Sequence, residues 1–148
     1  MFWILCVSSL KVFASSQQVE FSPNEKVKVV LVVRGNELQY AIFAPGKNRR
    51  GSLAFDTEKP VHVEVDDYDF SGMLGFSVWY VDGGKGIYTI HRVFVLSKNS
   101  ESFEEEFPEC GDEFINLRVD KKHRRLISMY YFDNEPKECV TRLRTRRK

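Results

Sequence analysis

Hydrophobic and polar residues alternate over short stretches of this chain, and turns rich in glycine, asparagine or proline separate the stretches. In residues 61–65 the three valines fall on one side of an extended chain, while His62 and Glu64 fall on the other. The same period of two recurs in residues 114–119. No helical period of 3.6 residues is sustained over ten residues or more. The pattern therefore predicts an all-β fold that is mostly antiparallel.

The predicted strands follow one another at short, regular spacing, which is typical of a β-sandwich or a barrel-like fold. They comprise residues 17–21, 26–33, 37–44, 52–55, 61–65, 76–81, 87–96, 114–119, 125–132 and 138–143. Residues 102–107, which precede Pro108, predict the one short helical turn of the chain. A length of 148 residues fits one domain, which we place at residues 15–143.

Composition excludes two classes of protein. A hydrophobic share of 43% argues against a disordered chain, and a net charge of +1 argues against a nucleic-acid binder. Charge is nevertheless uneven, because an acidic segment at 101–113 contrasts with basic residues at the end of the chain. Residues 144–148 predict a solvated basic tail, with a contact to phosphate or to a membrane surface as the alternative.

The first 14 residues predict an export signal. Residues 1–10 are apolar and too few to span a bilayer, and Ala14 is a small residue at a suitable cleavage position. The alternative is a buried first strand, because no lysine or arginine precedes the apolar run. Removal of the signal removes Cys6 and leaves Cys110 and Cys139. Two cysteines in an exported chain predict one disulfide, with two buried free thiols as the alternative.

Residues 61–97 hold the most specific signals of the chain, and the first is an acidic turn. Asp67, Asp69 and Ser71 alternate ahead of Gly72, as oxygen ligands do in a short calcium loop. Gly75 stands where a closing carboxylate is expected. A bound calcium ion and a turn held only by hydrogen bonds are therefore both open interpretations.

The second signal is a hairpin whose tip is rich in glycine. Its arms are residues 76–81 and 87–96, which are β-branched and aromatic. The glycines allow a partner to approach the backbone closely, and tyrosine is favoured at interface hot spots. An ordinary β-turn is the alternative reading of this segment. The candidate partner-binding residues are Asp82, Gly83, Gly84, Lys85, Gly86 and Tyr88.

Sequence motifs for catalysis do not occur. The three histidines, His62, His91 and His123, lie on separate predicted elements, and none has a metal-ligand spacing such as H-E-x-x-H. The chain also lacks a G-x-S-x-G elbow, a P-loop and a dinucleotide fingerprint. We therefore expect a binding protein and not an enzyme.

Four segments, taken in order, resemble a known family. They are V-x-D-Y-D-F-x-G at 65–72, Y-x-D-G-G-x-G-x-Y-T-I at 80–90, F-x-E-x-F-P-x-C at 103–110 and P-K-x-C at 136–139. In this order they resemble bacterial periplasmic immunity proteins and inhibitors related to the periplasmic i-type lysozyme inhibitors, some of which are calcium-binding lipoproteins. The resemblance covers about residues 61–143.

The resemblance implies an inhibitor that protects a Gram-negative cell from a lysozyme-like peptidoglycan hydrolase delivered by a competitor. A protruding loop would enter the cleft of the hydrolase, which makes the hairpin tip the inhibitory loop and Tyr88 its anchor. The chain lacks the acids of the family at Ser71 and Gly75, and it lacks a lipobox, which favours a soluble periplasmic form. The alternative function is an envelope carbohydrate- or peptidoglycan-binding module, in which Trp79, Tyr80 and Tyr88 form an aromatic platform.

Overall fold

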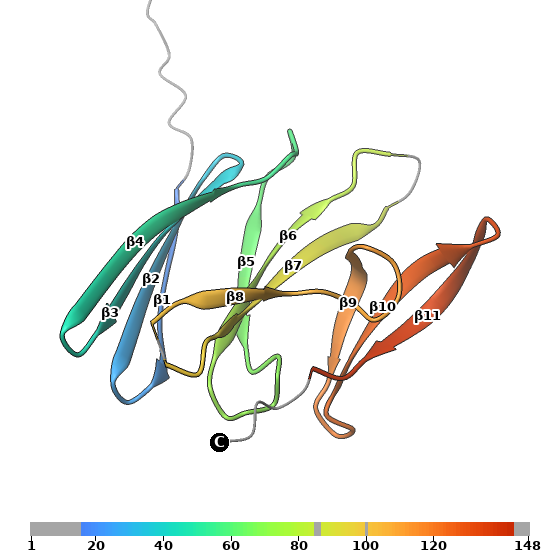
Figure 1. Ribbon diagram of the computed structural model, residues 1–148. Helices are drawn as coiled ribbons and strands as arrows, with labels where there is room; N and C mark the ends of the chain where they lie inside the picture. Colours follow the sequence, from blue (N-terminus) through green and yellow to red (C-terminus); the bar gives the residue numbers. More distant parts are fainter. Residues whose placement is uncertain (1–15, 85–86, 100, 144–148) are drawn as a thin grey trace, which may run out of the picture.

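The computed structural model describes residues 16–84, 87–99 and 101–143, and these residues form two antiparallel sheets (Figure 1). Within these ranges every regular element is a β-strand, so the prediction of an all-β, antiparallel single domain is confirmed. No helix in the same ranges is long and apolar enough to cross a membrane. The predicted signal at 1–14, Lys85, Gly86 and the basic tail at 144–148 lie outside the described residues.

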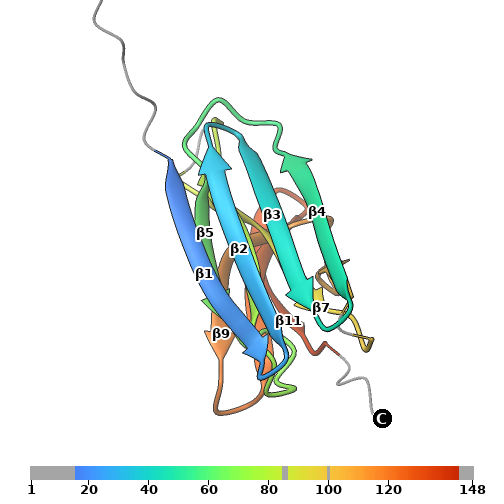
Figure 2. The same cartoon turned by 90° about the vertical axis from the view of Figure 1, so that its left-hand side faces the viewer.

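The first sheet is a meander of four strands, each paired with the next along the chain: β1 (Gln17–Asn24), β2 (Val27–Arg34), β3 (Glu37–Ala44) and β4 (Lys47–Ala54). Its turns are tight because Gly35 and Gly46 adopt positive φ angles of 61° and 74°. Strand β4 therefore begins at Lys47, which pairs with Ala44, and not at residue 52 as expected. The first sheet forms one layer in front of β9 and β11 (Figure 2).

The second sheet has the order β11-β10-β9-β7-β6-β5, and β8 also pairs with β7. These strands are β5 (His62–Asp66), β6 (Gly75–Val81), β7 (Thr89–Leu96), β8 (Phe103–Glu106), β9 (Phe114–Asp120), β10 (Arg125–Phe132) and β11 (Glu135–Thr141). The β10–β11 turn needs only Asp133 and Asn134, both with positive φ. Strand β11 therefore begins at Glu135, three residues before the predicted start at residue 138. Pro136 is tolerated because β11 is an edge strand.

Strand β8 corrects the prediction of a helical turn at 102–107. Phe103 pairs with Leu96, and its ring packs edge-on against Phe76 with 4.9 Å between ring centroids. Glu105 accepts two hydrogen bonds of 2.7 Å from the Arg92 guanidinium on the neighbouring strand. These contacts across strands outweigh the local preference of the glutamates for a helix.

The core has two parts because β7 is buried on both faces. Phe94 belongs to the cluster between the two sheets, where Val29, Leu31 and Leu38 meet Val63, Phe76 and Val78. Val93 and Val95 face the other way, into a second cluster with Tyr68, Phe114 and Leu126. The first sheet therefore covers one face of β7, and residues of β9 and β10 cover the other.

The predicted disulfide joins Cys110 to Cys139 across 29 residues. It ties the segment after β8 to β11, at a position where Cys139 is buried. Closing a loop of this length restricts the unfolded chain and contributes about 3–4 kcal/mol on the chain-entropy account.

Gly75 provides a test of how closely β6 and β7 approach. A Cβ atom at Gly75 would lie 2.4 Å from the backbone oxygen of Phe94, so an added methyl group forces backbone atoms apart. We expect Gly75→Ala to lower the free energy of unfolding by about 1–3 kcal/mol, as overpacking does in cores. Urea denaturation measures the change.

The matched control is Gly83→Ala, because nothing lies within 4 Å of a Cβ atom at Gly83 and its φ is not in the left-handed region. This variant should differ from the wild type by less than about 0.5 kcal/mol. Equal stability of the two variants would contradict the close approach.

Candidate functional site

The tip of the β6–β7 hairpin is closed by one backbone hydrogen bond among its described residues. The Asp82 amide donates to the carbonyl oxygen of Tyr88 over 2.8 Å. Immediately after the tip, the Thr89 amide donates to Oδ1 of Asn116 on β9 over 3.0 Å. The start of β7 is thus fixed to the neighbouring strand, and Tyr88 is held at the base of the tip.

Tyr88 contacts a second tyrosine that the sequence did not identify. The rings of Tyr88 and Tyr131 meet edge to face with 5.9 Å between centroids, and the Tyr131 hydroxyl donates a hydrogen bond to the Tyr88 hydroxyl. This bond raises the pKa of Tyr131 because it favours the neutral hydroxyl. Tyr131 lies on β10, so the β10–β11 hairpin supports the side chain proposed as the anchor.

These two tyrosines line a groove of about 850 Å³ that continues to Tyr80 and to the segment between β4 and β5. Ile90 and Ile115, which pair across β7 and β9, contribute apolar surface. Among the described residues that line the groove, four carboxylates stand against one lysine, Lys59. The carboxylates belong to Asp56, Glu58, Asp82 and Glu113.

The acidic character of this groove acts on Tyr80. Partial burial raises the pKa of Tyr80, and the negative charges of Glu113, Asp56 and Asp82 raise it further, while Arg92 opposes them. The tyrosine thus stays neutral and can donate its hydroxyl proton to a partner. Together these groups offer aromatic surface, hydroxyl donors and negative charge, which suits a partner with cationic and apolar groups.

Large apolar side chains are exposed beside the groove. Ile87 is 94% exposed, Phe132 60% and Tyr131 44%. Ile87 precedes Tyr88 ahead of β7, and Phe132 ends β10. The two hairpin ends meet through the pair Tyr88 and Tyr131. Exposed apolar groups next to a tyrosine pair are typical of a protein-binding surface.

The acidic turn between β5 and β6 is held by its own hydrogen bonds. Asp67 accepts from the amides of Ser71 and Gly72 over 3.0 and 2.8 Å, and Asp69 accepts from the Ser71 hydroxyl over 2.6 Å. Tyr68 between them is buried, donates to Ser77 over 3.0 Å and has a pKa raised by burial. These contacts are those of a turn held by hydrogen bonds, which was one of the two interpretations that the sequence allowed.

The same turn brings two carboxylates and one hydroxyl of the candidate calcium ligands together. Asp67, Asp69 and Ser71 are near one another, but no group of three or more acidic, histidine or cysteine side chains that could hold a metal occurs in the described ranges. Asp66 is paired with Lys121 over 3.0 Å. Gly75, the position of the absent acid, starts β6 against the Phe94 carbonyl and has no room for a side chain.

The three aromatic residues of the alternative platform do not share a face. Tyr80 and Tyr88 line the groove, whereas Trp79 lies on the opposite face of β6, as neighbouring residues of a strand must. Trp79 stacks on His62 with 4.2 Å between centroids and on His91 with 6.0 Å. The predicted platform of Trp79, Tyr80 and Tyr88 is therefore wrong. The third aromatic residue beside Tyr80 and Tyr88 in the groove is Tyr131.

Comparisons of the chain with protein-family models, with curated proteins and with solved structures found no match.

His91 gives the fold a pH dependence. Burial lowers the pKa of His91 to about 4 from its ordinary 6.5, so the unfolded chain takes up a proton at a higher pH than the folded protein. Stability contributed by the neutral ring is complete above pH 6.5 and is lost as pH falls toward 4. Between pH 7 and 4.5, we expect the free energy of unfolding of wild type to fall by about 2–3 kcal/mol more than that of His91→Gln.

Urea denaturation at the two pH values measures this difference. His62→Gln is the control, because His62 is exposed and pairs with the other side of Trp79. Parallel pH profiles of wild type and His91→Gln would contradict the assignment.

Proposed function

We propose that the protein is an exported, periplasmic immunity-type protein that binds and inhibits a lysozyme-like peptidoglycan hydrolase. The sequence of residues 1–14 supports export, and the order of motifs from 65 to 139 supports the family. The observation that carries the proposal is the pair Tyr88 and Tyr131, which holds an aromatic anchor at the base of the glycine-rich tip beside the acidic groove.

The hairpin is suited to enter a cleft. Its described tip residues Asp82, Gly83 and Gly84 carry little side-chain volume, and Ile87 is almost fully exposed ahead of Tyr88. The tip can then occupy the cleft while Tyr88 and Ile87 bury apolar area at its entrance. No chemistry on the hydrolase is required, since occupation of the cleft excludes the polysaccharide.

The acidic groove supplies the second half of the interaction. Asp56, Glu58, Asp82 and Glu113 surround the tyrosines and face a partner that approaches the tip. We infer that the hydrolase presents lysine or arginine side chains at the rim of its cleft. Such opposite charges raise the rate of association more than they slow dissociation.

Inhibition of a muramidase tests the proposal directly. Purified wild-type protein should suppress turbidity loss of a peptidoglycan suspension by a panel of lysozyme-like hydrolases. Tyr88→Ala should weaken binding to the inhibited enzyme by ~30-fold or more, as truncation of a tyrosine hot spot does. Calorimetry measures the affinity of the two proteins for that enzyme.

The matched control is Phe107→Ala, because Phe107 is also aromatic and is 61% exposed but lies outside the groove. Phe107→Ala should inhibit the hydrolase as strongly as wild type does. Absence of binding to every hydrolase of the panel would refute the proposal. Wild-type protein that sediments with peptidoglycan alone would favour the envelope-binding module instead.

The salt dependence of the association rate after neutralisation of two carboxylates is the second test. The double variant Asp56→Asn with Glu113→Gln removes two carboxylates without changing side-chain size. We expect its association rate with the inhibited hydrolase to fall several-fold at low salt, and the difference to disappear near 1 M salt. Stopped-flow fluorescence or surface plasmon resonance measures the rates.

Glu25→Gln is the control, since Glu25 lies in the turn between β1 and β2. This end of the sandwich contacts the start of β6, where the Leu74 amide donates to the Pro23 carbonyl, and is remote from the tip that follows β6. An equal fall in the association rate for this variant would contradict a role for the groove.

A further inference from the structure

A second hollow lies between the two sheets, and it shares no residue with the groove at the hairpin tip. Its volume is about 380 Å³, which is within the range of roughly 300–1,000 Å³ that small-molecule sites occupy. Three phenylalanines of the second sheet form one wall, and residues of β3 and β4 form the other. The apolar lining residues are Tyr40, Ile42, Leu53, Phe76, Phe94 and Phe103.

The hollow exists because the inward face of β4 carries little apolar volume. The register pairs Leu53 with Leu38, Gly51 with Tyr40 and Arg49 with Ile42, so these β4 residues face the second sheet. Of the inward positions, only Leu53 is a large apolar residue. At Gly51 a Cβ atom would lie 2.3 Å from the Tyr40 hydroxyl, so the tyrosine occupies the space that a side chain would need.

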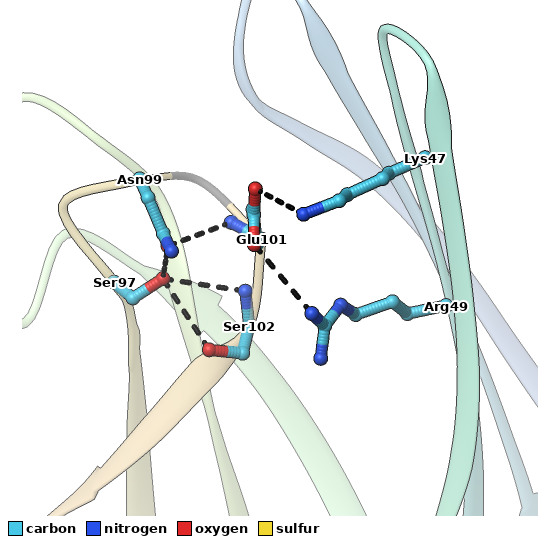
Figure 3. Close-up of polar contacts among 6 residues, drawn as sticks. All are labelled: Lys47, Arg49, Ser97, Asn99, Glu101 and Ser102. Carbon is cyan, nitrogen blue, oxygen red and sulfur yellow. Dashed lines mark hydrogen bonds and ion pairs between the residues drawn. The ribbon is translucent and has the colours of Figure 1, made fainter.

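The entrance of the hollow is positively charged. Lys47 and Arg49 extend from β4 to Glu101 on the loop between β7 and β8, at 2.7 and 3.5 Å (Figure 3). Arg50 alternates to the outer face of β4, so the entrance carries two cations against one carboxylate. The two paired cations are about half exposed, so solvent screens these ion pairs and they are easily exchanged.

Glu101 is held in place by its own loop. The Glu101 amide donates to Oδ1 of Asn99 over 3.2 Å, and the Ser102 amide donates to the Ser97 hydroxyl over 3.2 Å (Figure 3). These bonds hold the backbone of the loop, so the Glu101 carboxylate meets Lys47 and Arg49 in the position that the headgroup of a ligand would otherwise take.

We propose that this hollow binds a single-chain amphiphile with an anionic headgroup. The alkyl chain lies between the phenylalanines and Ile42, where it is removed from water. The headgroup displaces Glu101 and pairs with Lys47 and Arg49, which satisfies the excess positive charge. The inference concerns a site separate from the hairpin tip, so it stands or falls independently of hydrolase inhibition.

Titration with decanoate tests the site, with 1-decanol as the uncharged ligand of equal chain length. By calorimetry, we expect wild type to bind one decanoate and to bind 1-decanol more weakly. Glu101→Gln should tighten decanoate binding by about 2–5-fold, because it removes the competing carboxylate from exposed pairs. The double variant Lys47→Gln with Arg49→Gln should weaken it by about 5–10-fold.

The control is Glu20→Gln, which breaks a similarly exposed ion pair with Lys28 on the outer face of the first sheet and should leave decanoate affinity unchanged. Amide shifts in NMR should be confined to β3, β4, β6, β7 and β8. Sedimentation with phosphatidylglycerol vesicles separates the sources of the ligand, since co-sedimentation indicates a membrane lipid and binding of decanoate alone indicates a free fatty acid.

Either source supports the proposal. The proposal is overturned if the protein binds neither decanoate nor vesicles. It is also overturned if wild type, Glu101→Gln and the double variant bind decanoate with equal affinity. Amide shifts that fall only at the hairpin tip would also overturn it.

Discussion

Burial of strand β7 on both faces is the constraint on which the rest of the structure depends. Phe94 stacks on Phe76 with 4.9 Å between centroids in the core between the sheets, while Val93 and Val95 enter the second core. Both edges of β7 are also occupied, because β6 pairs along one edge and β9 and β8 share the other. A polar residue on either face must therefore find a partner within the protein. Arg92 finds Glu105, and His91 remains neutral.

The position of β7 also determines where each candidate site lies. Its first residues follow the hairpin tip and pair with β9, so Tyr88 is brought to the side of the molecule that β10 occupies. Its last residues pair with β8, whose Phe103 forms part of the wall of the hollow between the sheets. One strand thus separates an acidic, tyrosine-lined groove near its start from a cationic, phenylalanine-lined hollow near its end. The two sites suit ligands of opposite charge.

Alternation and turn chemistry predicted most of the fold because these signals are local. Period-two stretches marked the strands, and the count of cysteines marked the bridge between Cys110 and Cys139. The helical turn at 102–107 was wrong because the partners of Phe103 and Glu105 lie on β6 and β7, which local propensity does not register. The predicted strand at 52–55 is shorter than β4 because Lys47, Arg49 and Arg50 carry no apolar alternation, although charged residues suit an edge strand.

Only part of the candidate site could be predicted from the sequence, because sequence signals are local and the site joins distant segments. The tip residues Asp82, Gly83 and Tyr88 lie within one short segment and were predicted from the sequence, but Tyr131 is 43 residues from Tyr88 and carries no motif. Alternation within 125–132 places Tyr131 on a strand without indicating what lies opposite. Trp79 was assigned to the face of Tyr80, although strict alternation along β6 was sufficient to separate them.

The two walls of the groove come from distant parts of the chain, and this has a consequence for specificity. The β10–β11 hairpin is joined to β7 through β9, which pairs with β7 at only two positions, Ile90 with Ile115 and His91 with Phe114. The Cys110–Cys139 bridge adds a covalent tie between β11 and the segment after β8. The width of the groove is therefore set by core packing and by this bridge. Substitutions at Phe114 or Leu126, which lie in the second core and not in the groove, therefore change the width of the groove beside the Tyr88–Tyr131 pair.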